Sequence, residues 1–231
     1  MSHSGAELMP NAGAPTPTQP VLFTRQLLLF TAVCAAVALL PLLLGPRREM
    51  LRPAIWLGAV LTYRWLEQSV FRPSPVRGDR VAEWMFPFIY LGVTGSFLLP
   101  ALEFALLPRP LSGSVLTAGL VLAAFGTLLR YRAIDALGEQ LSTHVEVRPD
   151  HRLVDHGVYR HVRHPGTTGA MIFLLGAALI LHAYYSLIYI IGFLWVVLIV
   201  RMFVEERHSA ARMPGYREYM LRTKRVIPFI F

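Results

Sequence analysis

The longest uncharged stretch of this chain runs from Thr167 to Val200, 34 residues without a lysine, arginine, aspartate or glutamate. One straight helix of that length would extend about 50 Å, because a helix rises about 1.5 Å per residue. The hydrocarbon core of a bilayer is only about 30 Å thick. The run therefore predicts two membrane spans folded into a hairpin, with the turn around His182 to Ser186.

Three other apolar stretches approach the length of about 20 residues that a spanning helix needs. Gln26–Leu44 and Leu111–Leu129 carry no charge, and Trp84–Leu107 carries only Glu103. Together with the hairpin they predict five spans. We therefore expect an all-α fold, a polytopic membrane helical bundle.

A sixth span depends on Pro53–Phe71, which is apolar in its first half and carries Arg64 and Glu67 in its second. These two residues are three apart and share a helix face, so they would pair inside a bundle. An interfacial or partly inserted helix fits the same pattern. The sequence leaves five and six spans open.

Composition agrees with a membrane protein, since 55% of residues are hydrophobic and only 16% are charged, against about a quarter charged in soluble domains. The net charge of +8 would suit a nucleic-acid partner, but the arginines gather in short segments between apolar stretches, as in cytoplasmic loops. We expect membrane lipids and no nucleic acid as partners. The single cysteine, Cys34, lies in the first apolar stretch and is expected to be buried.

The domain organisation is simple. Residues 1–20 contain four prolines and no lysine or arginine, so they predict a disordered tail without a signal-peptide arrangement. Residues 21–231 predict a single transmembrane domain. The polar segments Arg130–Pro165 and Arg201–Phe231 are brought to one face by the hairpin, and their basic content makes that face cytoplasmic.

The end of the first polar segment is a candidate anion site. Pro165 suits the first position of a helix, which would place Arg163 and His164 just ahead of an open helix N-terminus. Gly166 and Gly169 would let a ligand or a neighbouring backbone approach closely. A basic loop lying on lipid headgroups is the alternative interpretation.

The end of the last apolar run gives a second candidate. Arg201 and Glu205 lie one helical turn apart, and Glu206 follows. They would form either a salt bridge at the membrane boundary or a site in which a carboxylate binds the ligand and the arginine faces an anionic acceptor.

Both candidates fall within one extended pattern. It is His-x-Leu-Val-x-x-Gly-x-Tyr-x-x-x-Arg-His-Pro, then an apolar hairpin, Glu-Glu, and Tyr-x-x-Tyr before Ile-Pro. This order resembles the isoprenylcysteine carboxyl methyltransferase family, which includes phospholipid methyltransferase-like relatives. The motif-bearing half is residues 120–231. The matching residues are His151, Leu153, Val154, Gly157, Tyr159, Arg163, His164, Pro165, Gly169, Glu205, Glu206, Tyr216, Tyr219, Ile227 and Pro228.

The resemblance implies a membrane enzyme that binds S-adenosyl-L-methionine in a cytoplasmic pocket, formed by the loop before the hairpin and the C-terminal segment. The membrane would be a bacterial inner membrane or an endomembrane. The implied cofactor-binding residues are His151, Leu153, Val154, Gly157, Tyr159, His164, Pro165, Gly169, Glu205 and Glu206. Arg163 and Arg201 would orient the acceptor as catalytic residues. No metal is implied.

The acceptor stays open, as a small or lipophilic molecule with a carboxylate, thiol, amine or lipid headgroup. Methyl transfer from a sulfonium is an in-line displacement, so the protein mainly aligns the acceptor and excludes water. Three alternatives remain: a non-catalytic membrane protein that retains the fold, a metal-dependent enzyme using the histidines between His144 and His164, and a nicotinamide-dependent reductase.

Overall fold

The computed structural model describes residues 29, 32–37, 39, 50–70, 79–107, 110–141, 145–147 and 153–226. The expected tail at residues 1–20 lies outside these residues, as does most of the expected span Gln26–Leu44. Cys34 is described and is buried in the core, as its place in an apolar stretch predicts.

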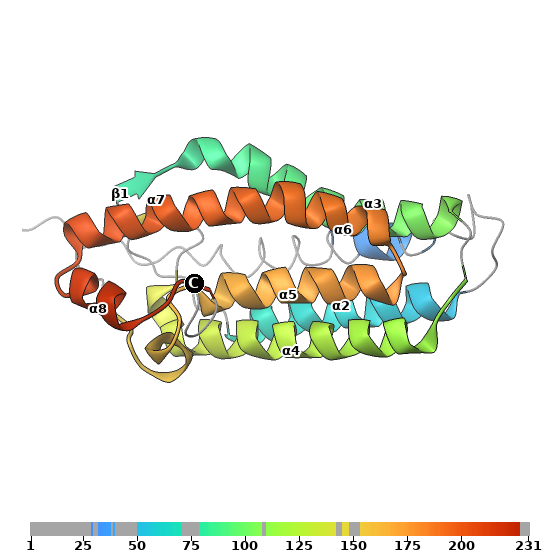
Figure 1. Ribbon diagram of the computed structural model, residues 1–231, viewed down its shortest axis with the longest axis horizontal. Coiled ribbons are helices and arrows are strands. Elements are labelled where there is room, and N and C mark those ends of the chain that lie inside the picture. Colours follow the sequence, from blue (N-terminus) through green and yellow to red (C-terminus); the bar gives the residue numbers. More distant parts are fainter. Residues whose placement is uncertain are drawn as a thin grey trace, which may run out of the picture.

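The described chain is almost entirely helical (Figure 1). The helices are α2 (Leu51–Val70), α3 (Phe86–Leu106), α4 (Gly113–Leu137), α5 (Pro165–Ile180), α6 (Tyr184–Tyr189), α7 (Val196–Arg212) and α8 (Tyr216–Arg222). Short 3-10 turns occupy Glu83–Met85, Gly138–Gln140 and Gly157–Arg160, and a π-helix, Ile190–Trp195, joins α6 to α7. The expected all-α bundle is confirmed, with one addition: β1 (Asp79–Val81) and β2 (Val145–Val147) form a small antiparallel ribbon that the sequence did not predict.

Three described helices are long and apolar enough to cross a membrane: Glu83–Leu106, Gly113–Leu137 and Tyr184–Arg212. The first confirms the expected span Trp84–Leu107, and the third contains the second arm of the hairpin. The first arm, α5, is a shorter apolar helix of 16 residues. The protein is an integral membrane protein.

Two helix limits differ from the prediction. α4 continues eight residues beyond Leu129, through Arg130, whose Nε and Nη2 pair with Glu67 of α2 within the bundle. The hairpin turn lies at Leu181–Ala183, slightly before the expected position, and Ser186 is already inside α6. His182 takes a positive φ of 55° in this turn, and its Nδ1 accepts a hydrogen bond of 3.1 Å from Arg52.

The ambiguous segment forms α2, which packs against α4 and α5 within the bundle. Arg64 and Glu67 pair on one face of this helix, as their spacing predicts. Glu67 also accepts hydrogen bonds from Arg130 of α4. Of the two alternatives, the structure therefore has the helix that pairs its charges inside the bundle.

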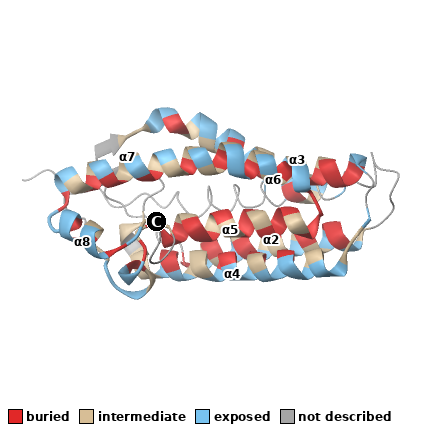
Figure 2. Cartoon of the chain, viewed as in Figure 1, coloured by how far each residue is buried: buried red, intermediate tan, exposed pale blue. Residues whose placement is uncertain are grey.

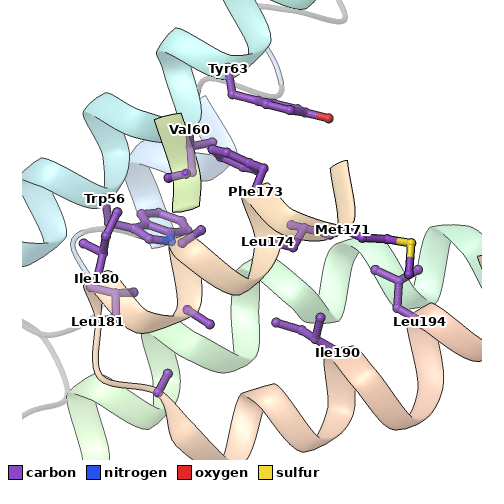
Figure 3. Packing of buried hydrophobic residues seen from close by; sticks show 14 of the residues in the cluster. Trp56, Val60, Tyr63, Met171, Phe173, Leu174, Ile180, Leu181, Ile190 and Leu194 are labelled. Atoms are coloured by element: carbon purple, nitrogen blue, oxygen red, sulfur yellow. The ribbon is translucent and has the colours of Figure 1, made fainter. Parts of the chain in front are cut away.

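α5 occupies the centre of the bundle and is buried along most of its length (Figure 2). In Figure 1, α5 lies in one layer with α2 and α4, and α3 lies in a second layer with the continuous helix that ends in α7. Trp56 and Val60 of α2 approach Phe173 of α5 from one side, and Ile190 and Leu194 approach α5 from the other (Figure 3).

Glycines allow α4 and α5 to come into backbone contact. A Cβ atom on Gly126 would lie 2.4 Å from the amide nitrogen of Phe173, and one on Gly176 would lie 2.4 Å from that of Ala123. Small residues at helix interfaces are typical of membrane bundles, where close van der Waals packing drives association. This seam fixes where α5 begins relative to Arg130 of α4.

Candidate functional site

The two polar segments meet at one end of the bundle, where the loop before α5, the C-terminal part of α7, α8 and residues 223–226 lie together (Figure 1). α5 begins at Pro165 with His164 as its cap residue, which confirms the expected helix start. The ring of Pro165 fixes φ and needs no hydrogen-bond acceptor for its nitrogen, which suits the first helical position.

Glu206 is the centre of a buried ion-pair network. Its Oε1 accepts a hydrogen bond of 2.7 Å from Arg163 Nε, and His164 Nε2 lies 3.2 Å away. Its Oε2 accepts a hydrogen bond of 2.6 Å from Nη2 of Arg225. The Glu206 side chain is only 3% exposed. Both carboxylate oxygens are therefore used by the protein itself.

The same network fixes the C-terminal segment, residues 223–226, against the loop before α5. The amide of Arg163 donates to the carbonyl of Lys224 at 2.8 Å, and the amide of His164 donates to that of Arg225 at 3.1 Å. Arg163 Nη1 also donates to the carbonyl oxygens of Met220 and Thr223. The guanidinium of Arg225 lies 3.9 Å over the ring of Phe203. Backbone and side-chain contacts thus hold the C-terminal segment against the loop before α5, and its closure of a cofactor pocket stays a prediction.

Arg163 is largely occupied by contacts within the protein. Its side chain is 8% exposed, and its donors serve Glu206 and two backbone carbonyls. These contacts tie α5 to α7 and to the C-terminal segment. A direct contact between Arg163 and an acceptor stays a prediction that no contact in the structure tests.

A cluster of tyrosines lies beside this network. The hydroxyl of Tyr219 donates a hydrogen bond of 2.7 Å to the carbonyl of Tyr159, and the rings of Tyr216 and Tyr219 meet edge to face at 5.8 Å. Leu153 packs against this pair. Burial raises the pKa of the Tyr159 hydroxyl, which the charge of Arg130 lowers and that of Glu205 raises. Tyr159 therefore marks the place where α4, α7 and the loop before α5 converge.

Glu205 differs from its neighbour Glu206. It is partly exposed, and within the described part of the chain its carboxylate accepts no hydrogen bond. It interacts electrostatically with Arg201, one turn earlier on α7, and with Tyr159 and Tyr216. Of the two glutamates, Glu205 is the one available to a ligand.

Contacts join Leu153 and Tyr159 to the tyrosines of α8, and Arg163 and His164 to Glu206. Val154, Gly157, Pro165 and Glu205 lie in the same segments of the chain. Gly157 begins a 3-10 turn with a positive φ of 59°, which glycine adopts without strain. Gly169 faces α4, where a Cβ would lie 2.6 Å from the amide nitrogen of Arg130. This close approach of a neighbouring backbone is one of the two interpretations expected for this glycine, and its contact with a cofactor stays a prediction. His151, Ile227 and Pro228 lie outside the described residues.

Two contributors were not expected from the sequence. Arg225 completes the Glu206 network from 19 residues further along the chain, a separation at which no local pattern predicts a contact. Arg130 of α4 lies beside Tyr159 and Arg201, although the sequence only placed it at the start of a polar segment. Its position directly after an apolar stretch was the one available signal.

Within the described residues, no three His, Cys, Asp or Glu side chains gather as a metal site would require. His144 and His151, two of the five histidines between His144 and His164, are outside those residues.

The segments that carry this site are similar to a known protein family. Residues 115–212 match the family model described as phospholipid methyltransferase. The predicted resemblance is confirmed. This phospholipid methyltransferase-like segment covers α4, α5, α6 and α7, and hence Arg130, Arg163, Arg201 and both glutamates.

Curated relatives match about half of the chain or somewhat more. The chain is 33% identical over 118 residues to a probable protein-S-isoprenylcysteine O-methyltransferase of Oryza sativa subsp. indica, a match that covers 48% of the chain and 60% of the relative. It is 27% identical over 147 residues to the protein-S-isoprenylcysteine O-methyltransferase of Dictyostelium discoideum, covering 61% and 60%. The chain therefore spans about three fifths of the length of these relatives.

The fold of the whole chain is similar to a solved structure, that of the eukaryotic intramembrane Ras methyltransferase, isoprenylcysteine carboxyl methyltransferase. The TM-score is 0.55 at 18% identity, and the match covers 92% of this chain and 88% of the other. The likeness extends to helices before the matched segment, so α2 and α3 belong to a shared architecture.

Proposed function

We propose that this chain is an integral-membrane methyltransferase that uses S-adenosyl-L-methionine. The observation that carries the proposal is the joining of the two motif halves: Arg163 and His164 before α5 meet Glu206 of α7 in one buried network. The family resemblance concerns only the presence of these motif residues in the sequence. Their convergence beside an available carboxylate, Glu205, supports a ligand site at this end of the bundle.

The described residues fit the proposed cofactor. An anionic carboxylate beside the rings of Tyr159 and Tyr216 suits a ligand that carries a sulfonium and an ammonium group. Glu205 would bind the ammonium group, and the buried tyrosines would exclude water. The cofactor supplies an electrophilic methyl group when bound.

Separate roles follow for the two arginines. Arg201 lies on α7 one turn closer to the middle of the membrane span than Glu205, so it would orient an acceptor that arrives from the bilayer. Arg163 would act by positioning, since it holds Glu206 and the C-terminal segment. A carboxylate acceptor needs no base, whereas a thiol or amine would have to lose a proton, for which His164 or a glutamate is at hand.

The proposed acceptor is lipophilic. The relatives named above act on protein-S-isoprenylcysteine by their names, which describe a prenyl chain next to a carboxylate. Such a molecule would keep its apolar part in the bilayer while its carboxylate reaches Arg201.

The proposed orientation places the site on the cytoplasmic face, because the loop before α5 and α8 are rich in arginine. Arg160 is exposed in that loop. A cysteine at this position, in a chain lacking Cys34, should resist a membrane-impermeant thiol reagent in intact cells and react after permeabilisation. Rapid labelling of intact cells would contradict the orientation.

Calorimetry of the purified chain in detergent with S-adenosylhomocysteine tests the activity proposal. We expect one site per chain, and Glu205→Gln should weaken binding by about 1–3 kcal/mol because a charged hydrogen bond is lost. Glu218→Gln, an exposed acidic residue of α8, is the matched control and should bind normally. Absence of both heat and thermal stabilisation at millimolar ligand would overturn the assignment.

A further inference from the structure

Arg130 is held in place from outside the family-matched segment. Its Nε and Nη2 donate hydrogen bonds of 3.0 and 2.6 Å to Oε1 of Glu67, which belongs to α2. The other carboxylate oxygen of Glu67 accepts from Arg64. Two fixed donors on one oxygen leave a planar guanidinium little freedom to rotate, so the direction of its third nitrogen, Nη1, is set by α2.

Nη1 points to the start of α5. A Cβ atom on Gly166 would lie 3.4 Å from Nη1, so the glycine keeps the space beside this nitrogen open. Among the described residues, Nη1 donates no hydrogen bond, and the Arg130 side chain is 26% exposed. A guanidinium nitrogen that stays accessible while the other two are paired can donate a charge-assisted hydrogen bond to an anion.

The surrounding charges favour an anion as the partner of Nη1. The positive charges of Arg130 and Arg201 are close enough to disfavour each other, and Glu205 interacts with Arg201. An anion bound at Nη1 would reduce the repulsion between these two guanidiniums.

We propose that Arg130 binds a ligand carboxylate through Nη1 and that Glu67 is the positioning residue that aims it. The inference rests on the proposed function, and it adds a binding residue and its α2 support to that site. The carboxylate belongs either to the amino-acid end of the cofactor or to the acceptor. A purely structural Glu67–Arg130 pair joining α2 to α4 is the competing explanation.

Two pairs of compounds distinguish these sources in the purified full chain. S-adenosylhomocysteine carries a carboxylate that 5′-methylthioadenosine lacks, and an N-acetylated S-prenylcysteine carries one that its carboxamide lacks. Arg130→Gln should reduce affinity for the carboxylate-bearing member of one pair by tenfold or more while leaving the other member unchanged. A selective loss in the first pair assigns the cofactor carboxylate, and a selective loss in the second pair assigns the acceptor carboxylate.

Glu67→Gln should produce the same selective loss to a smaller extent, about threefold, because glutamine still accepts one hydrogen bond from Arg130 but has no charge. The matched control is Arg64→Gln, which removes the other guanidinium on Glu67 and leaves Nη1 in place. It should lower the melting temperature without changing either compound preference. Should Arg130→Gln not fold, the double variant Glu67→Gln/Arg130→Gln replaces this ion pair by two neutral amides and gives the same readout.

Equal losses for both members of each pair, or no change in either preference, would overturn the inference and leave a structural ion pair. Failure of the unmodified chain to bind S-adenosylhomocysteine would instead overturn the proposed function, and this inference with it. Titration of the unmodified chain with S-adenosylhomocysteine therefore distinguishes the two failures.

Discussion

Arg163 Nε donates a hydrogen bond of 2.7 Å to Oε1 of Glu206, joining the loop before α5 to the last turns of α7 across 43 residues of sequence. Both side chains are less than one tenth exposed. Because Arg225 and His164 share the same carboxylate, this contact organises the whole end of the bundle. The pair thus joins two motifs that are far apart in the sequence, Arg-His-Pro and Glu-Glu.

Removing this carboxylate should release the C-terminal segment. Glu206→Ala leaves two buried guanidiniums without their anion, which typically costs about 3–5 kcal/mol. We expect a large fall in melting temperature and faster tryptic cleavage at Lys224 and Arg225. Glu205→Gln is the control, since its carboxylate is not part of the network, and it should melt near the parent. Equal stability of the two variants would show that the network does not hold the segment.

Arg201 should affect turnover more than cofactor binding. Arg201→Ala is expected to leave affinity for S-adenosylhomocysteine nearly intact and to lower turnover of an acidic prenylcysteine at least tenfold, or about 1.4 kcal/mol. Arg201→Lys should recover little, because an ammonium cannot reproduce a planar two-point contact. A structural link between Arg201 and Glu205 predicts the opposite pattern, in which both variants lose stability and cofactor affinity in parallel.

The glycine seam between α4 and α5 should be intolerant of a methyl group. In Gly126→Ala the new Cβ would lie 2.4 Å from the amide nitrogen of Phe173, so the helices must separate, at a cost of about 1–3 kcal/mol. Gly58→Ala is the matched control, because nothing lies within 4 Å of its Cβ position in α2. That change should be neutral or stabilising by up to about 1 kcal/mol. Melting temperatures of both variants test this prediction, and equal values would contradict it.

Tyr219 should make stability depend on alkaline pH. Burial raises the pKa of its hydroxyl to about 12, the largest cause being desolvation, whereas an unfolded tyrosine titrates near about 10. The unfolded chain therefore loses its proton first, and stability that is complete below pH 10 falls as the pH rises towards 12.

Tyr219→Phe should show less of this alkaline loss, and at neutral pH it should cost about 1–2 kcal/mol because the carbonyl of Tyr159 loses its donor. Tyr216→Phe is the comparison, since burial also raises the pKa of that hydroxyl. It should reduce the alkaline loss as well. Chemical denaturation at several pH values measures both effects, and identical pH profiles for parent and Tyr219→Phe would contradict them.

The sequence by itself determined the fold class and the main elements. Long apolar runs must form helices in a bilayer, since every backbone polar group has to be satisfied within its own segment. The charge-free run from Thr167 to Val200 thus required a hairpin, and Pro165 fixed where its first helix begins. The spacing of Arg64 and Glu67 likewise predicted their pair.

Only the tertiary structure decided how the charged residues are shared between helices. Glu205 and Glu206 are adjacent and chemically identical, yet successive helical residues point about 100° apart. Glu206 is therefore buried and paired with Arg163 and Arg225, while Glu205 is partly exposed and outside that network. Gly169 was expected to allow the close approach of a ligand or a neighbouring backbone, and the backbone of α4 lies against it. Arg130 acquires its direction from Glu67, 63 residues away. These ion-pair and packing partners depend on how helices that are distant in sequence pack together, so no local sequence pattern predicts them.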